Sequence, residues 1–156
     1  MNQNTTMSRR GFFTKAGQAG LAAAGLAALP NVASANTKVT ETLAKYVPGS
    51  EGAMAEKVTL ETPIIAENGA VVPVTVKVDH PQEADNYIKS LTILVESNPT
   101  PFAANFNFTP KSGNAGAALR LKIGKTSKVS AYAVTNTGKV YMASNDVKVT
   151  IGGCGG

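Results

Sequence analysis

The only cysteine of this 156-residue chain, Cys154, stands third from the C-terminus, after Gly152 and Gly153 and before Gly155 and Gly156. Glycine has no side chain that could bury a neighbouring thiol, so the pattern argues against a packing role for this cysteine. No cation or histidine lies among the last seven residues, so nothing adjacent activates the sulfur as a nucleophile. The last five residues therefore predict a flexible arm that offers a thiol to other molecules.

The remaining polar side chains suggest little other chemistry. The single histidine, His80, lies in a turn and is interpreted as a solvent-exposed residue rather than a general base. One cysteine and one histidine, without Cys-x-x-Cys spacing, do not make a metal site, so no metal or cofactor is predicted. Glu83 and Asp85 belong to a polar loop and are interpreted as solvated. No catalytic residue is predicted.

The N-terminal segment resembles a twin-arginine export signal. Arg9 and Arg10 precede an apolar stretch, Ala16–Leu29, which is shorter than the roughly 20 residues that cross a bilayer. Pro30 is expected to stop a helix, and the small residues Ala33-Ser34-Ala35 supply a cleavage site. We therefore expect a cleaved signal rather than a retained membrane anchor.

Removal of residues 1–35 takes away three cations and no acid, so the net charge falls from +5 to +2. A mildly basic chain without tryptophan is not expected to bind nucleic acid, and the cations between Lys111 and Lys148 are interpreted as a soluble face. Twin-arginine export carries folded proteins, so we expect the mature chain, beginning at Asn36, to work in the periplasm. A lone thiol there is intermolecular, modified or reactive.

Residues 57–151 show the period of two that is typical of strands with one buried face. Val72, Val74, Val76 and Val78 give the clearest example, and Pro73 among them is expected at an edge or bulge. About seven or eight short strands predict an all-β, immunoglobulin-like antiparallel sandwich. The expected strands are 57–61, 72–78, 91–95, 102–108, 119–123, 129–133, 140–143 and 147–151.

Within a predicted N-terminal helical segment, 36–56, a short helix is expected over 37–47, because apolar residues recur there at helical spacing before Pro48-Gly49. At the other end, Val147, Val149 and Ile151 are expected to anchor the last strand by a buried face, with order ending at Ile151. At about 3.3 to 3.6 Å per residue, the thiol would stand roughly 10 Å beyond this root. The predicted organisation is signal 1–35, helical segment 36–56, sandwich 57–151 and arm 152–156.

The Gly-Gly-Cys-Gly-Gly end directly after the strand Val-Lys-Val-Thr-Ile resembles the SoxY family, the sulfur carriers of the Sox thiosulfate-oxidation system. Residues 63–76, 98–108 and 138–144 are also similar, so the resemblance covers essentially the whole mature chain. It implies that Cys154 takes thiosulfate as a thiosulfonate adduct, Cys-S-S-SO3−. It further implies that the chain is a covalent carrier and not an enzyme.

The resemblance also implies partners. A c-type haem enzyme would oxidise the sulfur pair, a metal-dependent hydrolase would release sulfate, and a molybdenum enzyme would oxidise the remaining sulfur. A SoxZ-like β-sandwich subunit without its own export signal would form a heterodimer with this chain. Two alternatives stay open: Cys154 forms a structural disulfide between subunits, or the chain is an independent thiol enzyme, against which the missing base and cation argue.

Overall fold

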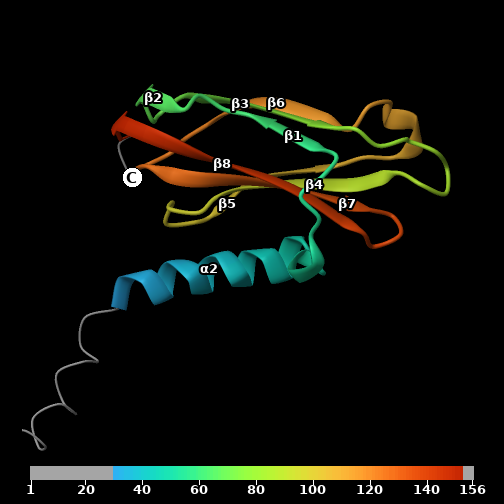
Figure 1. Ribbon diagram of the computed structural model, residues 1–156, viewed down its shortest axis with the longest axis horizontal. Coiled ribbons are helices and arrows are strands. Elements are labelled where there is room, and N and C mark those ends of the chain that lie inside the picture. Colours follow the sequence, from blue (N-terminus) through green and yellow to red (C-terminus); the bar gives the residue numbers. More distant parts are fainter. Residues whose placement is uncertain (1–29, 153–156) are drawn as a thin grey trace, which may run out of the picture. The chain divides into compact units, whose positions relative to one another are not determined.

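Two facing β-sheets form the body of this computed structural model, which describes the backbone of residues 30–152 and the side chains of residues 37–152 (Figure 1). Contacts divide the chain into two units, residues 1–34 and 35–156, and the strands belong to the second. The sheets have the orders β1-β3-β6 and β2-β8-β7-β4-β5. The strands are β1 (Val58–Glu61), β2 (Ile65–Asn68), β3 (Val72–Val78), β4 (Ile88–Val95), β5 (Phe102–Asn107), β6 (Gly116–Leu121), β7 (Ser127–Thr135) and β8 (Val140–Ile151).

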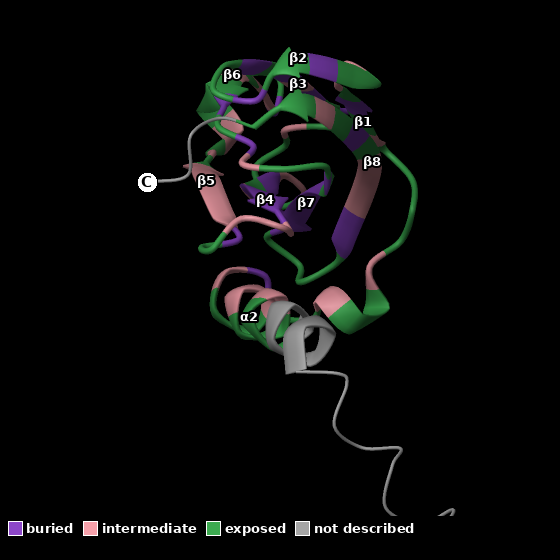
Figure 2. Ribbon diagram, turned by 90° about the vertical axis from the view of Figure 1, so that its left-hand side faces the viewer, coloured by how far each residue is buried: buried purple, intermediate pink, exposed green. Residues whose placement is uncertain are grey.

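Buried residues of both sheets belong to one hydrophobic cluster, and Figure 2 shows buried segments in both layers. In β3, the four valines that the alternation predicted as a core face are all buried, and the residues between them are more exposed. The opposite sheet contributes the fully buried residues Leu91, Ile93, Val95, Val129, Ala131 and Ala133. The predicted two-layer sandwich is confirmed.

Pro73 lies in a part of β3 that has one neighbouring strand. β1 pairs with β3 only from Thr75 to Val78, whereas β6 pairs with it from Val72 to Lys77 and places Arg120 opposite Pro73. Proline fits here because no strand on the open side requires a backbone N–H. The expected edge position is confirmed, although β3 is the middle strand of its sheet.

The last strand differs from the prediction. Segments 140–143 and 147–151 were expected as separate strands, but β8 is continuous. The polar residues between them keep their pairing with β7, as Val129 opposite Asn145 illustrates. β2 was not predicted at all, and it pairs with β8 in parallel, so the larger sheet is mixed rather than wholly antiparallel.

The N-terminal helix α2 (Pro30–Tyr46) is longer than predicted. It begins at Pro30; the apolar stretch that Pro30 was expected to stop, residues 16–29, lies outside the described residues. Proline is compatible with the first helical turn because the N–H that it lacks has no partner there. The predicted stop at Pro48-Gly49 is confirmed, since α2 ends at Tyr46, Gly49 has φ +84° and a short 3-10 helix, η1 (Ser50–Gly52), follows.

The helix packs on a second apolar cluster. Val39, Leu43 and Tyr46 are partly buried against residues of β4, β7 and β8. The Tyr46 ring also stacks on Phe102, with 4.3 Å between the ring centroids. The buried members of this cluster are Val47, Leu94, Tyr132, Val134 and Val140. Among the described residues, no helix is long and apolar enough to cross a membrane.

Candidate functional site at the root of the C-terminal arm

The predicted thiol site, Cys154, lies outside the described residues, as do Gly153, Gly155 and Gly156 and the predicted signal arginines Arg9 and Arg10. The structure describes the chain that leads to the thiol, up to Gly152. This root of the arm, defined here as Ile151 and Gly152, fixes where the last four residues begin.

Backbone hydrogen bonds hold the end of β8. The Gly69 N–H donates to the Ile151 carbonyl at 2.9 Å, and the Lys148 N–H donates to the Ile64 carbonyl at 2.9 Å. The Val149 N–H donates to Thr126 Oγ1 at 3.1 Å. An unbonded backbone group costs much free energy only where it is buried. These hydrogen bonds therefore order the strand end rather than offset such a cost.

Burial contributes less at this end than the sequence predicted. Val147 is fully buried and Val149 is partly buried, as expected, but the Ile151 side chain is 70% exposed. The expectation of a buried Ile151 is wrong because the sandwich core ends before this residue. The root is held by the hydrogen bonds of β2 and of its following loop instead.

Gly152 has a role that the sequence did not indicate. A Cβ atom at this position would lie 2.5 Å from the Gly124 carbonyl oxygen, a distance that real Cβ atoms essentially never show. Gly152 therefore permits the arm to pass close to the backbone of another loop. Gly152 is therefore needed for the close approach of its backbone to the Gly124 carbonyl.

Asn98 holds the loop that contacts Gly152. Its Oδ1 accepts the Gly124 N–H at 3.0 Å, and its Nδ2 donates to the Lys122 carbonyl at 2.9 Å. Between these residues, the Ile123 side chain is fully buried and its N–H donates to the Gly69 carbonyl at 2.7 Å. Sequence reasoning missed Asn98; the turn-forming pair Asn98-Pro99 was the available signal.

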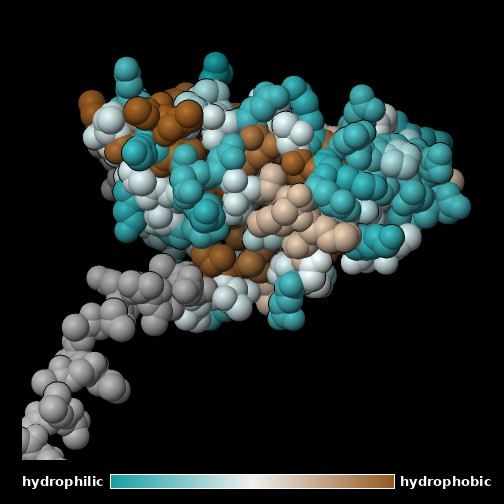
Figure 3. All heavy atoms as spheres, in the orientation of Figure 1, coloured by the Kyte–Doolittle hydropathy of each residue, from teal (hydrophilic) through white to brown (hydrophobic). Residues whose placement is uncertain are grey.

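Apolar side chains surround the root. Figure 3 shows hydrophobic residues gathered over the region where Figure 1 labels β2. Four large apolar residues of β2, its flanking loops and the end of β8 are more than half exposed, namely Ile64, Ile65, Val71 and Ile151. Lys148 is exposed on the neighbouring β8, opposite Ile65. The arm thus leaves the protein beside a surface on which these four apolar side chains are exposed.

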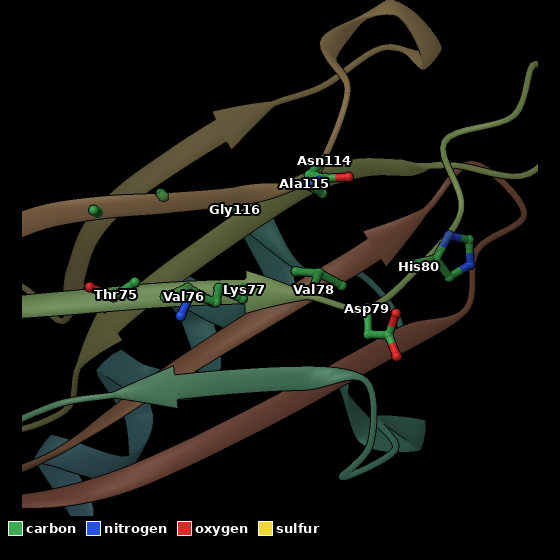
Figure 4. A pocket seen from close by; sticks show the side chains of 11 residues that line it. Thr75, Val76, Lys77, Val78, Asp79, His80, Asn114, Ala115 and Gly116 are labelled. Carbon is green, nitrogen blue, oxygen red and sulfur yellow. The ribbon is translucent and has the colours of Figure 1, made fainter.

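The other residues singled out in the sequence do not form a chemical site. His80, expected to be exposed, is partly buried because its ring packs 5.9 Å from the Tyr141 ring. Figure 4 shows it with Asp79 beside a shallow depression over β3 and β6. Glu83 and Asp85 are exposed loop residues, as predicted. Within residues 37–152, no group of three potential metal-binding side chains occurs.

One described group has a shifted pKa. Burial raises the pKa of the Tyr132 hydroxyl above its ordinary value of 10.0, the Glu96 carboxylate adds to the increase, and a hydrogen bond with Ser130 partly opposes it. Tyr132 belongs to the cluster beneath α2 rather than to the arm root. Its shift therefore concerns stability and not the carrier site.

The family of the chain follows from its sequence match. The family model described as "Sulfur oxidation protein SoxY" matches residues 44–154, which include Cys154 as the last residue. The chain belongs to the SoxY family. A search of curated proteins gives no match.

Solved structures agree with this assignment. The chain is 30% identical to the sulfur carrier protein SoxY from Chlorobium limicola f thiosulfatophilum, over 74% of this chain and 99% of that one, with a TM-score of 0.58. This likeness confirms the immunoglobulin-like fold and, with the family match, supports a sulfur-carrier role in sulfur oxidation.

A superoxide reductase (neelaredoxin) from Ignicoccus hospitalis is also similar. It is 21% identical over 66% of this chain and 88% of that one, with a TM-score of 0.53. At this identity the likeness concerns the fold alone. The sandwich is thus shared by proteins of different function, so function has to be argued from the arm and its root.

Proposed function

We propose that this SoxY-family protein is a periplasmic carrier that binds thiosulfate-derived sulfur covalently on Cys154 and presents the intermediates to Sox enzymes during oxidation to sulfate. The observation that carries the proposal is the family match that runs through Cys154. The arm root supports it, because Gly152 leaves the fold at an exposed edge only two residues before the thiol. The carrier itself is not an enzyme.

Each oxidation step needs a partner enzyme that takes up the electrons, and each hydrolysis step needs one that adds the water. The Cys154 thiol loses its proton, and the sulfur and thiosulfate together lose two electrons to a c-type haem enzyme, giving Cys-S-S-SO3−. A metal-dependent hydrolase adds water, which releases sulfate and two protons and leaves Cys-S-S−. A molybdenum enzyme oxidises this outer sulfur with three waters, releasing six electrons and six protons. A second hydrolysis of Cys-S-SO3− releases sulfate and restores the thiolate.

Covalent attachment explains why a protein without catalytic groups is useful. A free anion would diffuse away between the enzymes, whereas a tethered one stays at a high effective concentration near each site that the arm enters. Export of the folded protein fits a SoxZ-like partner that travels with it as a heterodimer. That partner and the three enzymes are part of the proposal.

Intact-mass analysis of the native protein tests the proposal. Protein from thiosulfate-fed cells should carry oxyanion or extra-sulfur masses on the C-terminal peptide, and Cys154→Ser should abolish thiosulfate oxidation while thermal unfolding stays unchanged. Gly52→Ala is the matched control, because open space surrounds that glycine. A reducible dimer without sulfur adducts would instead support the structural disulfide, and turnover by the purified protein alone would support a thiol enzyme.

A further inference from the structure

Two loops from distant parts of the sequence meet at the point where the arm leaves the fold. The β6–β7 loop brings the Gly124 carbonyl against Gly152, and the β4–β5 loop brings Asn98 against Gly124. Asn98 uses both ends of its amide, so its side chain bridges Lys122 and Gly124 on either side of the buried Ile123. A side chain that uses donor and acceptor together has one orientation only.

A second link holds the same loop to β8. Ser97 Oγ donates to the Thr126 carbonyl at 3.1 Å, while Thr126 Oγ1 accepts the Val149 N–H at 3.1 Å. The Ser97 N–H in turn donates to Ser127 Oγ at 3.0 Å. The β6–β7 loop is thus attached on one side to the Ser97-Asn98 segment and on the other to the strand that carries the arm.

This geometry places the Gly124 carbonyl directly beside Gly152, the first residue of the arm. The Gly124 carbonyl lies so close to Gly152 that it restricts the backbone conformations open to this glycine. Cys154 follows two residues later, within about 7 Å at 3.3 to 3.6 Å per residue. Over so short a distance, the backbone conformation at Gly152 limits the positions that the thiol can reach.

We propose that Asn98 is a positioning residue for the carrier thiol. By holding Gly124 against Gly152, its amide limits the directions in which the chain can continue after Gly152, and loss of the amide lets the β6–β7 loop relax and widens that range. The functional consequence rests on the proposed carrier function, since a directed arm enters an enzyme's site more often. The effect on the arm's distribution does not depend on that function.

Spin labelling tests the structural part. The lone native Cys154 and an introduced Lys89→Cys on the exposed face of β4 each receive a nitroxide, and pulsed electron resonance measures their distance distribution. Asn98→Ala should broaden this distribution or shift its maximum. Asn98→Asp keeps the acceptor for the Gly124 N–H but loses the donor to Lys122, so it should give an intermediate width. Distributions equal to that of the parent protein would overturn the proposal.

A second variant reaches the same contact without touching Asn98. Gly152→Ala places a methyl group against the Gly124 carbonyl and should displace the distribution, whereas Gly153→Ala adds the same methyl group one residue further on. Gly52→Ala, in open space, controls for the general effect of losing a glycine. If Gly152→Ala displaces the label no more than Gly153→Ala does, the close approach to Gly124 does not direct the arm.

Enzyme kinetics test the functional part. With the sulfonated carrier as substrate of its sulfate-releasing hydrolase, Asn98→Ala should raise KM by about tenfold and leave kcat unchanged, because misdirection lowers productive encounters but not chemistry after entry. A fall in kcat with unchanged KM would overturn this part. If no sulfur adduct forms on Cys154, the carrier function fails, yet the distance distributions still decide the positioning role of Asn98.

Discussion

Asn145 connects the two sheets through its side-chain amide. From β8, its Nδ2 donates to the Leu60 carbonyl at 2.7 Å and to Thr62 Oγ1 at 3.2 Å, at the end of β1 and just beyond it. The residue is partly buried, so its partners would lose a bond that water replaces incompletely. A polar residue in the middle of a strand is therefore a structural link here.

We predict that Asn145→Ala lowers the free energy of unfolding by about 1 to 3 kcal/mol, because the Leu60 carbonyl loses its donor. Denaturant titration followed by circular dichroism measures the change. Asp146→Ala is the matched control on the adjacent residue: its ion pair with Lys128 is exposed and 3.4 Å long, so about 0.5 kcal/mol or less is expected. Equal effects of the two substitutions would contradict the role of Asn145.

Tyr132 gives a prediction for alkaline pH. Its pKa is raised in the folded protein, chiefly by burial and then by Glu96, so the folded state disfavours the ionised phenol. The stabilisation is complete below the unfolded pKa of about 10 and is lost as the pH rises through the higher folded pKa. Tyr132→Phe removes this dependence. Above about pH 10, the stability difference between the parent protein and Tyr132→Phe should shift toward the variant, as thermal unfolding at successive pH values would reveal. A difference that stays constant from pH 8 to about 11 would contradict it.

The sequence could predict residues whose role follows from their neighbours in the chain, but not residues whose hydrogen-bond partners are remote in the sequence. Cys154 and its glycines are conspicuous in the sequence alone. Asn98 bonds to residues 24 and 26 positions away, and Asn145 bonds to one 85 positions away. Both partners of Asn98 are backbone groups, which carry no side-chain identity that a sequence could reveal. Only the folded chain brings these groups together.

At the scale of elements, the alternation of apolar and polar residues predicted the strands that have one buried face. β3 was predicted because its valines alternate without interruption. β2 escaped prediction because it has one buried residue in four, Ala66, and its position follows from parallel pairing with β8. β8 was divided in two because Ser144, Asn145 and Asp146 interrupt its apolar pattern, although the backbone ladder continues through them.

Helix α2 is held by tertiary contacts, which predicts a cost for loosening it. The side chain of Leu43, a residue of α2, packs against the cluster that contains Val47 and Leu94. Leu43→Ala should lower the free energy of unfolding by about 1 to 3 kcal/mol, through lost apolar burial at a partly exposed site. The exposed Lys45→Ala, two residues away, should change it by less than about 0.5 kcal/mol. Denaturant titration of both variants decides, and similar values would show that the helix is not docked through Leu43.

At the scale of the whole molecule, the predicted signal cleavage site lies inside a helix. The bond between Ala35 and Asn36 falls within α2, which runs from Pro30 to Tyr46. A peptidase binds its substrate extended, so the first turns of the helix have to unwind locally before cleavage; frayed helix ends open at little cost. The docking residues Val39, Leu43 and Tyr46 all follow the cleaved bond. The remaining helix therefore keeps its contacts with the sandwich.

Export of the intact protein and of an Arg9→Lys, Arg10→Lys variant tests this sequence of events. The parent protein should be recovered from the periplasm with Asn36 at its N-terminus and with thermal stability close to that of the purified precursor, because removal of residues 1–35 leaves the docked residues in place. The double variant should accumulate inside the cell at precursor mass, since a twin-arginine signal is recognised through this pair. Mass spectrometry of both fractions measures the processing site. Export of the variant at the parent level, or a mature chain lacking Leu43, would contradict the predicted signal.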